Sequence, residues 1–313
     1  MKKFKKALFG ALTVAAAVLA TACSSSKSSS SSKGYTPSKS HPLTIQFVPS
    51  QAASTLEAKA KPLEKILSKK LGVPVKISMS TDYNTVVEAM KSKKVDVGFL
   101  PPDGYVLAHK QKAADVLLQA LRYGVKQPGG KATNKLVKFY RSEILVKKGS
   151  KIKSWKDLKG KKIAVQNATS SAGYIFPIAE LKEKGLDLTK KGNANLVTVT
   201  GHDQAVLDVL NGDVDAAFTF EDARNTVLAD QPNIMKKVVP IYFTTGIPND
   251  TISVRSDMSS SFRKKLSKAF ESLRKDKKSL KIIESIYSHE GYTPSKDSDF
   301  NIVRKYDKMA ATK

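Results

Sequence analysis

The sequence predicts an α/β protein of two lobes, each a mostly parallel sheet with helices on both faces. Short apolar segments of strand length alternate with amphipathic helical segments in residues 43–100, and the series recurs in residues 143–218. Parallel strands need crossover connections, which the helical segments supply. A chain of 313 residues is also long enough for two domains.

The first series is defined by its hydrophobic spacing. Leu56, Leu63 and Leu67 lie on one face of a predicted helix, together with Ala60 and Ile66. The predicted elements are a strand at 43–48, a helix at 52–71, a strand at 73–79, a helix at 83–91 and a strand at 95–100.

The second series follows a link and is flanked by two further extended segments, at 140–146 and 251–254. Its elements are an extended segment at 143–146, a strand at 162–166, a helix at 172–184, a strand at 196–200, a helix at 203–210 and a strand at 214–218. The chain is therefore expected to cross between lobes twice, and the helices in 260–287 to return to the first lobe. This assigns residues 42–141 and 253–313 to lobe 1 and residues 142–252 to lobe 2, with a two-strand hinge and a ligand cleft between them.

Residues 1–22 have the pattern of a lipoprotein signal peptide. Four lysines in residues 2–6 precede an apolar run at 7–22, which is shorter than the roughly 20 apolar residues of a membrane span. The run stops at Cys23, the only cysteine, which could carry lipid once the leader is removed. Ala20 stands where such signals most often have leucine, and the alternative is a soluble secreted protein with a chance cysteine.

Residues 23–41 are predicted to form a tether between this lipid anchor and the folded part. Residues 24–32 are serine except for Lys27, and such a segment buries too little apolar surface to offset the entropy of ordering. The hexapeptide GYTPSK at 34–39 recurs at 291–296, a repeat that the sequence alone does not explain.

The chain is strongly basic, with a formal net charge of +26. Its lysines are dispersed in pairs and are not gathered with aromatic residues into a nucleic-acid module, so no nucleic-acid partner is expected. One cysteine allows no internal disulfide, and stability must come from packing.

Seven short motifs occur in an order typical of one family. They are DY at 82–83, VDVGFLPPDGY at 95–105, YRS at 140–142, LKGK at 158–161, SSAGY at 170–174, GHD at 201–203 and PND at 248–250. Together with GYTPSKDSDF at 291–300 they resemble the substrate-binding lipoproteins of phosphate, phosphite and phosphonate ABC importers. The resemblance implies a type II periplasmic-binding fold that closes over one small phosphorus oxyanion and delivers it to permease subunits in the membrane.

Ser170, Ser171 and Ala172 form the strongest candidate anion site. They stand between a predicted strand and a predicted helix, where free backbone N–H groups and the helix dipole favour an anion. The alternative is that one serine only caps the helix. The resemblance favours anion binding, through amides and hydroxyls without a formal counter-charge.

The resemblance places further ligand contacts at Tyr83, Tyr140 and His202, which would donate hydrogen bonds to the oxyanion. Each could instead only pack or cap. Tyr105 is left out of this set, because Pro101 changes the loop before it.

Glu221 and Asp250 need a different role, because carboxylates repel a fully ionised anion. The resemblance implies that such acids hold the ammonium group of an aminoalkylphosphonate or accept a proton from the ligand. Asp222 is an equal contender with Glu221 by position, and Phe218 and Phe220 could narrow the pocket or belong to the core.

An enzyme is the main rival class, but little supports it. The chain has no Gly-x-Ser-x-Gly elbow, no P-loop and no metal-ligand spacing among its four histidines, so no catalysis, cofactor or metal is expected. The sequence thus predicts a solute-binding protein anchored on the extracytoplasmic face of the cell membrane. The alternative is a protein of the same fold that binds an amino acid or a sulfonate.

Overall fold

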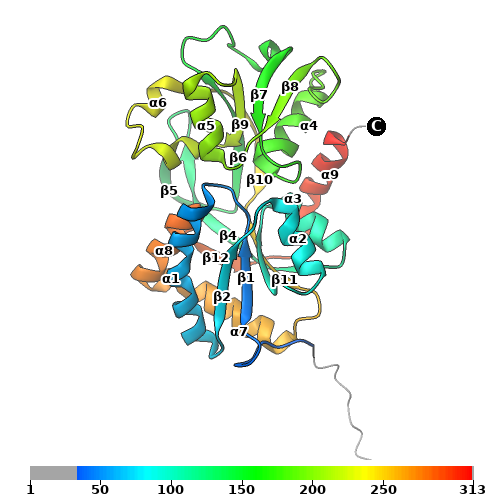
Figure 1. The fold of residues 1–313 in the computed structure, drawn as a ribbon, viewed down its shortest axis with the longest axis vertical. Helices are drawn as coiled ribbons and strands as arrows, with labels where there is room; N and C mark the ends of the chain where they lie inside the picture. Colours follow the sequence, from blue (N-terminus) through cyan, green and yellow to red (C-terminus); the bar gives the residue numbers. More distant parts are fainter. Residues whose placement is uncertain (1–33, 312–313) are drawn as a thin grey trace, which may run out of the picture. The chain divides into compact units, whose positions relative to one another are not determined.

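Two β-sheets with flanking helices make up residues 34–311, the part of the chain that this computed structural model describes (Figure 1). The predicted leader, Cys23 and the serine-rich part of the predicted tether lie outside the described residues. No helix within residues 34–311 is both long enough and apolar enough to span a membrane.

The first sheet carries the predicted β–α–β series and strands from three later parts of the chain. Its strands are β1 (Leu43–Phe47), β2 (Val75–Met79), β3 (Val97–Leu100), β4 (Ala114–Lys126), β5 (Lys131–Val137), β11 (Thr251–Arg255) and β12 (Gly291–Pro294). They lie in the order β12-β4-β11-β3-β1-β2, with β5 paired to β4. The helices of this lobe are α1 (Ala53–Leu71), α2 (Tyr83–Lys91), α3 (Pro102–Lys110), α7 (Ser260–Glu271) and α8 (Lys277–Tyr287).

The second sheet has the order β10-β6-β9-β7-β8. Its strands are β6 (Phe139–Lys147), β7 (Lys161–Val165), β8 (Ala194–Thr198), β9 (Ala216–Phe220) and β10 (Val238–Pro248). Its helices are α4 (Phe176–Glu183), α5 (His202–Asn211) and the short α6 (Ile234–Lys237), and the C-terminal helix α9 (Asn301–Ala310) follows the last strand of the first sheet.

Both sheets are mixed, which differs from the mostly parallel sheets that the sequence predicts. β1 pairs in parallel with β2 and β3, and β7 with β8 and β9. The strands that cross between lobes run the other way: β11 is antiparallel to β3, and β6 is antiparallel to β9. A strand that comes from the other lobe enters the sheet at the end where its parallel strands finish. It therefore runs antiparallel to them.

The core of the first lobe follows the predicted helix spacing. Leu56, Leu63 and Leu67 of α1 are fully buried with apolar side chains of α7, α8 and the sheet. Truncating one such leucine to alanine typically costs about 2–5 kcal/mol. Helices α7 and α8 thus pack with α1 on the first sheet and fix the frame on which the cleft is built.

The C-terminal helix α9 joins the two lobes on one side. Tyr306 of α9 stacks on Phe176 of α4 with ring centroids 4.2 Å apart, and its hydroxyl donates to Glu180 at 3.1 Å. The sequence predicts the whole of residues 253–313 in lobe 1, whereas this helix packs on a helix of the second sheet (Figure 1).

The two crossing segments lie side by side and are tied together by Asn249. Its backbone N–H donates to the Lys138 carbonyl at 2.8 Å, and its side-chain amide donates to the Ala120 carbonyl at 3.1 Å. Gln119 also donates to the Lys138 carbonyl, at 3.1 Å. These bonds hold the hinge segments in register and so position Asp250, which directly precedes β11.

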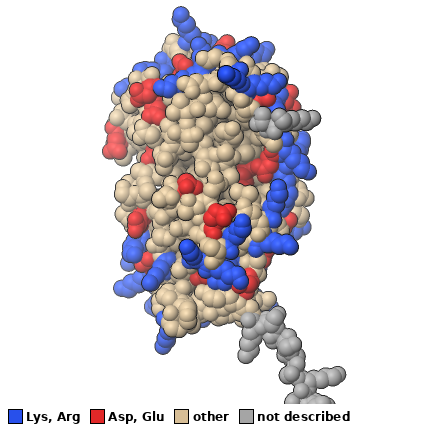
Figure 2. All heavy atoms as spheres, turned by 45° about the vertical axis from the view of Figure 1, so that its right-hand side comes forward, with Lys and Arg blue, Asp and Glu red and all other residues tan. Residues whose placement is uncertain are grey.

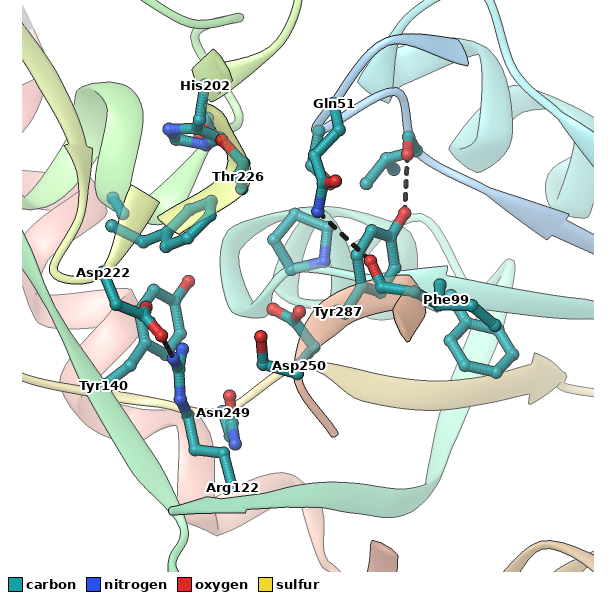
Figure 3. Close-up of a pocket in the computed structure, with 18 of the residues that line it drawn as sticks. Gln51, Phe99, Arg122, Tyr140, His202, Asp222, Thr226, Asn249, Asp250 and Tyr287 are labelled. Atoms are coloured by element: carbon teal, nitrogen blue, oxygen red, sulfur yellow. Dashed lines mark hydrogen bonds and ion pairs between the residues drawn. The ribbon is translucent and has the colours of Figure 1, made fainter. Parts of the chain in front are cut away.

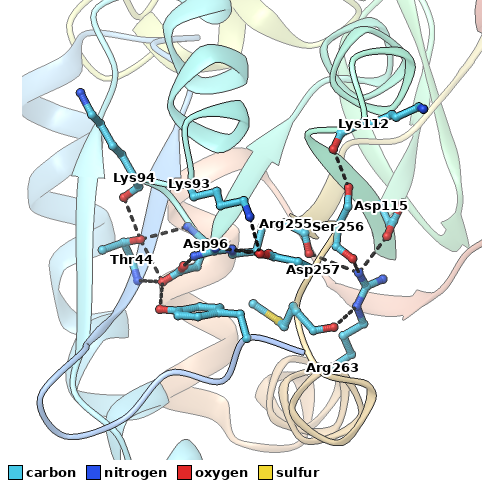
Figure 4. Close-up of polar contacts among 12 residues, drawn as sticks. Thr44, Lys93, Lys94, Asp96, Lys112, Asp115, Arg255, Ser256, Asp257 and Arg263 are labelled. Carbon is cyan, nitrogen blue, oxygen red and sulfur yellow. Dashed lines mark hydrogen bonds and ion pairs between the residues drawn. The ribbon is translucent and has the colours of Figure 1, made fainter. Parts of the chain in front are cut away.

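Tyr35, which falls within the predicted tether at 23–41, makes defined contacts with the first lobe. The Tyr35 ring lies over the Arg255 guanidinium at 3.8 Å, and its hydroxyl donates to Asp96 at 3.3 Å. Arg255 also pairs with Asp96 at 3.0 Å and with Asp257 at 2.6 Å (Figure 4). This charged cluster gives the start of the segment a fixed partner that composition alone does not reveal.

Basic side chains are spread over both lobes on the face shown in Figure 2, with acidic side chains among them. The repeated hexapeptide has two different structures: its first copy makes a single β-bridge between Tyr35 and Met258, and its second copy contains β12. The repeat therefore does not mark a repeated structural unit.

Candidate functional site

A cavity of about 240 Å³ lies between the two lobes, at the level of the hinge (Figure 3). Its lining combines side chains from both sheets, from the hinge and from the end of α8. Six of the eight predicted ligand-binding residues are among them: Tyr83, Tyr140, Ser170, Ala172, His202 and Asp250.

The lobes are closed around this cavity by direct hydrogen bonds. Four of these join the two sides of the cleft: His202 N–H to the Ser50 carbonyl at 2.9 Å, Ala52 N–H to Asp203 Oδ2 at 3.0 Å, Asp103 N–H to Ser171 Oγ at 3.2 Å, and Thr169 Oγ1–H to Asn84 Oδ1 at 3.2 Å. These contacts hold the two lobes together beside the cavity.

The start of the helix after β7 forms one wall of the cavity. Ser170 precedes a π-helical turn, Ser171–Ile175, which runs into α4, and its hydroxyl accepts from the Gly173 N–H at 3.2 Å. The N–H groups of Ser171 and Ala172 stand in the first turn, where no intrahelical acceptor exists. Ser170 therefore does cap the helix, as the alternative interpretation held, and the same residue faces the cavity.

Gly173 allows this turn to lie close to its neighbours. A Cβ atom at this position would come within 2.2 Å of Gln166 Cγ and 2.9 Å of Ser170 Oγ. Gln166 in turn holds Gly201, just before His202, through two hydrogen bonds of 3.1 and 3.2 Å. The glycine thus keeps the two cavity-lining loops of the second lobe in contact.

Tyr83 and Tyr140 bring phenol groups to the same wall from different lobes. Tyr83 is the first residue of α2, which Asp82 caps by accepting from the Thr85 N–H at 2.9 Å. Burial raises the pKa of Tyr83 and of Tyr140, and the nearby hydroxyls of Ser170 and Ser171 oppose this only in part. Both phenols therefore stay protonated and can donate to an anion.

His202 is buried against Phe220, with ring centroids 4.8 Å apart. Burial lowers the pKa of His202 to about 3, so the imidazole is neutral at physiological pH. Its Nδ1 atom has no hydrogen-bond partner among the described residues. A neutral imidazole keeps one N–H donor, which could serve an oxyanion in the cavity.

Asp222, and not Glu221, lines the cavity. Glu221 accepts from Gln127 Nε2, in the β4–β5 turn, at 2.8 Å and from the N–H of Arg141, in β6, at 3.2 Å. Asp222 accepts from Arg122 Nη2 with both carboxylate oxygens, each at 2.6 Å. Of the two acids that position alone left equal, the structure brings Asp222 to the site.

Asp250 follows Asn249 at the hinge, and its carboxylate points into the cavity (Figure 3). The nearest ring nitrogen is His289 Nε2, at 3.5 Å from Oδ2. This acid is therefore available to accept a hydrogen bond from a ligand.

Ser171 also lies outside the lining, because its hydroxyl faces Asp103 across the cleft. Tyr105, left out of the predicted set, donates to Asp297 at 2.7 Å and does not line the cavity. Phe220 lines the cavity, whereas Phe218 is fully buried in the core.

Several lining residues were not predicted from the sequence. They include Gln51, Arg122, Asn249 and Tyr287. Asn249 lies inside the PND motif and could have been found there, whereas Arg122 has no local signal because its partner Asp222 is 100 residues away. The sequence predicts a site that holds its anion without a formal counter-charge. In the structure, Arg122 adds a guanidinium to the lining. Within the described residues no cluster of three or more metal-ligating side chains occurs.

Comparisons with known proteins agree with this geometry. Residues 45–300 match the family described as "ABC transporter, phosphonate, periplasmic substrate-binding protein". The chain is 31% identical over 228 residues to the phosphate-import protein PhnD of Mycolicibacterium smegmatis, which covers 70% of this chain and 66% of that protein. It is 24% identical over 270 residues to the phosphonates-binding periplasmic protein of Escherichia coli, which covers 83% of this chain and 74% of that protein.

A solved structure shares the fold. The PhnD1 protein of Prochlorococcus marinus, in complex with methylphosphonate, has a TM-score of 0.72 at 18% identity, with 85% of this chain and 97% of that chain covered. This likeness confirms the type II periplasmic-binding fold that the motifs predict.

Proposed function

Because this chain belongs to the family of periplasmic substrate-binding proteins of phosphonate ABC transporters, we propose that it captures a small phosphorus oxyanion between its lobes. It then delivers this ligand to a membrane permease. The protein acts by binding and hinge closure alone and performs no chemistry on the ligand.

One observation carries this proposal: donors suited to an oxyanion meet in one cavity between the lobes. The first-turn N–H group of Ala172, the hydroxyls of Tyr83 and Tyr140 and the ring of His202 come from both lobes. Helix starts favour anions through their unsatisfied N–H groups and the helix dipole. An anion at this wall would therefore satisfy donors on both sides of the cleft at once.

The cross-lobe hydrogen bonds suggest how binding drives closure. A ligand held by both lobes has more contacts in the closed form than in the open form, and only such differential affinity can shift the equilibrium. The permease would then meet the closed, ligand-loaded protein, with its two lobes in a fixed relation.

We further propose that Cys23 carries lipid and anchors the protein on the extracytoplasmic face of the membrane. The support is the leader pattern at residues 1–22 followed by a serine-rich segment. Replacing Cys23 with serine should move the protein from the membrane fraction to the soluble fraction. A protein that stays in the membrane fraction after this change would contradict lipid anchoring.

A thermal-shift screen tests the proposed ligand class, with phosphate, phosphite, methylphosphonate, sulfate and arginine as probes. A ligand at about 100 times its Kd should add roughly 2.7 kcal/mol of stability, which is a few degrees in Tm for a protein of this size. The double variant Tyr83→Phe/Tyr140→Phe should lose most of the shift, whereas Tyr123→Phe, outside the cavity, should keep it. A shift with arginine or sulfate and none with phosphorus compounds would replace the proposal by another solute of the same fold.

A further inference from the structure

We infer that the Arg122–Asp222 ion pair sets the ligand class of this cavity, by favouring phosphorus oxyanions without an amine over aminoalkylphosphonates. This inference rests on the proposed function, since it concerns the substituent on phosphorus. It assigns Arg122, on β4 of the first sheet, a specificity-determining role that no local sequence pattern indicates.

The ion pair is buried and well formed. Arg122 Nη2 reaches both oxygens of Asp222 at 2.6 Å, and the two side chains are 7% and 11% exposed. The guanidinium also lies 5.8 Å from the centre of the Tyr140 ring. Burial opposes the charge of Arg122, but the charges of Asp222, Glu221 and Asp250 outweigh it, and the pKa of Arg122 is raised. Arg122 is thus a permanent cation in the cavity wall.

This pair removes one of the two acids that an ammonium group could use. A buried ammonium needs carboxylate acceptors to offset its lost hydration. The cavity offers Asp222 and Asp250, and both oxygens of Asp222 are already engaged (Figure 3). A ligand amine could reach Asp222 only by displacing a guanidinium that makes two short bonds.

The guanidinium also places its own positive charge at this corner. Arg122 Nε is buried and has no hydrogen-bond partner among the described residues, so this edge of the guanidinium offers an unused donor. A ligand ammonium next to Arg122 would add a second positive charge and further hydrogen-bond donors. The guanidinium already supplies one charge and an unused donor at this position. Such an unfavourable contact gives selectivity against aminoalkylphosphonates and needs no new contact to phosphorus oxyanions without an amine.

Asp250 remains as the one carboxylate of the lining that no guanidinium engages. A single carboxylate can accept from a neutral donor such as the P–OH group of a partly protonated oxyanion. Glu221 does not add to it, because Gln127 and the Arg141 N–H hold its carboxylate outside the lining. The ligands that fit are phosphate, phosphite and short alkylphosphonates.

The test compares 2-aminoethylphosphonate with propylphosphonate, in which a methyl group replaces the ammonium group. Calorimetric Kd values are measured for both, and for phosphate, with the wild-type protein and with Arg122→Met and Asp222→Asn. Wild type should bind propylphosphonate more tightly than the amine by on the order of tenfold. Arg122→Met frees Asp222 and should shift this ratio toward the amine by on the order of tenfold, whereas Asp222→Asn should shift it the other way.

The double variant Arg122→Met/Asp222→Asn is the matched control, because it removes both charges and leaves no lone buried ion. It should not gain affinity for the amine. If Arg122→Met does not fold, the opposite shift expected for Asp222→Asn decides the matter. Thr169→Ala, which breaks the cross-lobe contact with Asn84 without changing charge, should leave the ratio unchanged.

The outcomes separate this inference from the proposed function. If no phosphorus compound binds to wild type, the proposed function fails. If phosphate or an alkylphosphonate binds but the ratio is the same in wild type and both single variants, or if wild type prefers the amine, the inference about Arg122 fails and the proposed function stands.

Discussion

The backbone N–H of Asp103 donates a hydrogen bond to Ser171 Oγ at 3.2 Å, across the cleft between the lobes. Both residues are buried, and burial with the nearby charge of Asp307 raises the pKa of the Asp103 carboxyl well above its usual value. Ser171 therefore serves closure with its hydroxyl, while its backbone belongs to the helix start that faces the cavity.

The change Ser171→Ala should weaken ligand binding. Without the hydroxyl, the Asp103 N–H is left without this acceptor in the closed form but can reach water in the open form. An unsatisfied buried donor costs about 1–3 kcal/mol, and this cost should appear in the calorimetric Kd. Ser261→Ala, on the exposed face of α7, is the control. Equal affinities in wild type and Ser171→Ala would show that the contact with Asp103 does not contribute to closure.

Gly173→Ala should lower both stability and affinity. The added Cβ would overlap Gln166, and relieving that overlap displaces the loop that carries His202. Overpacking of this kind typically costs about 1–3 kcal/mol, to be measured by chemical unfolding. Gly129→Ala is the matched control, because no atom lies within 4 Å of a Cβ at that position. A Gly173→Ala protein as stable as the control would refute the close packing of this turn.

His202 predicts how the stability of the ligand-free protein depends on pH. Its pKa is lowered from 6.5 to about 3, so below pH 6.5 the unfolded state binds a proton that the folded state does not. The free energy of unfolding should therefore fall as the pH decreases. From pH 7 to pH 5 His202 should account for about 2 kcal/mol of that loss.

Chemical unfolding of wild type and His202→Gln at both pH values isolates this contribution, because glutamine does not titrate. The variant should lose about 2 kcal/mol less than wild type between the two pH values. Parallel losses in the two proteins would mean that His202 is already hydrated or charged in the folded state.

Tyr35→Ala should lower stability and leave ligand affinity unchanged. The Tyr35 ring covers Arg255 on the first lobe, away from the cavity lining. A cation–π contact contributes about 0.5–2 kcal/mol, depending on its hydration. Tyr35→Phe keeps the ring and should retain most of the stability. A changed Kd in Tyr35→Ala would mean that the N-terminal segment influences the cleft.

Sequence periodicity predicted the elements whose pattern is local. The helix predicted at residues 83–91 has those limits in the structure, and the strand predicted at 43–48 is β1 (Leu43–Phe47). Apolar residues at regular spacing carry this information within one element. The segment between residues 101 and 140 received no assignment, and it contains α3, β4 and β5.

Long-range contacts explain most of the remaining differences. β4 is extended because it pairs with β11, β12 and β5, two of which come more than 100 residues later. Among the site residues, Tyr83 and Tyr140 were placed by motif resemblance, whereas Arg122 depends on a partner in the other lobe. Glu221 and Asp222 are adjacent in sequence, and only the turn after β9 decides which of the two faces the cavity.

A crystal structure of the protein with bound phosphate or methylphosphonate is the decisive measurement for the proposed ligand site. We expect a phosphorus atom in the cavity between the lobes, with its oxygens at hydrogen-bond distance, about 2.6–3.2 Å, from the Tyr83 and Tyr140 hydroxyls and from the N–H group of Ala172. A phosphorus atom bound elsewhere, or a cavity that stays empty at saturating ligand, would contradict it.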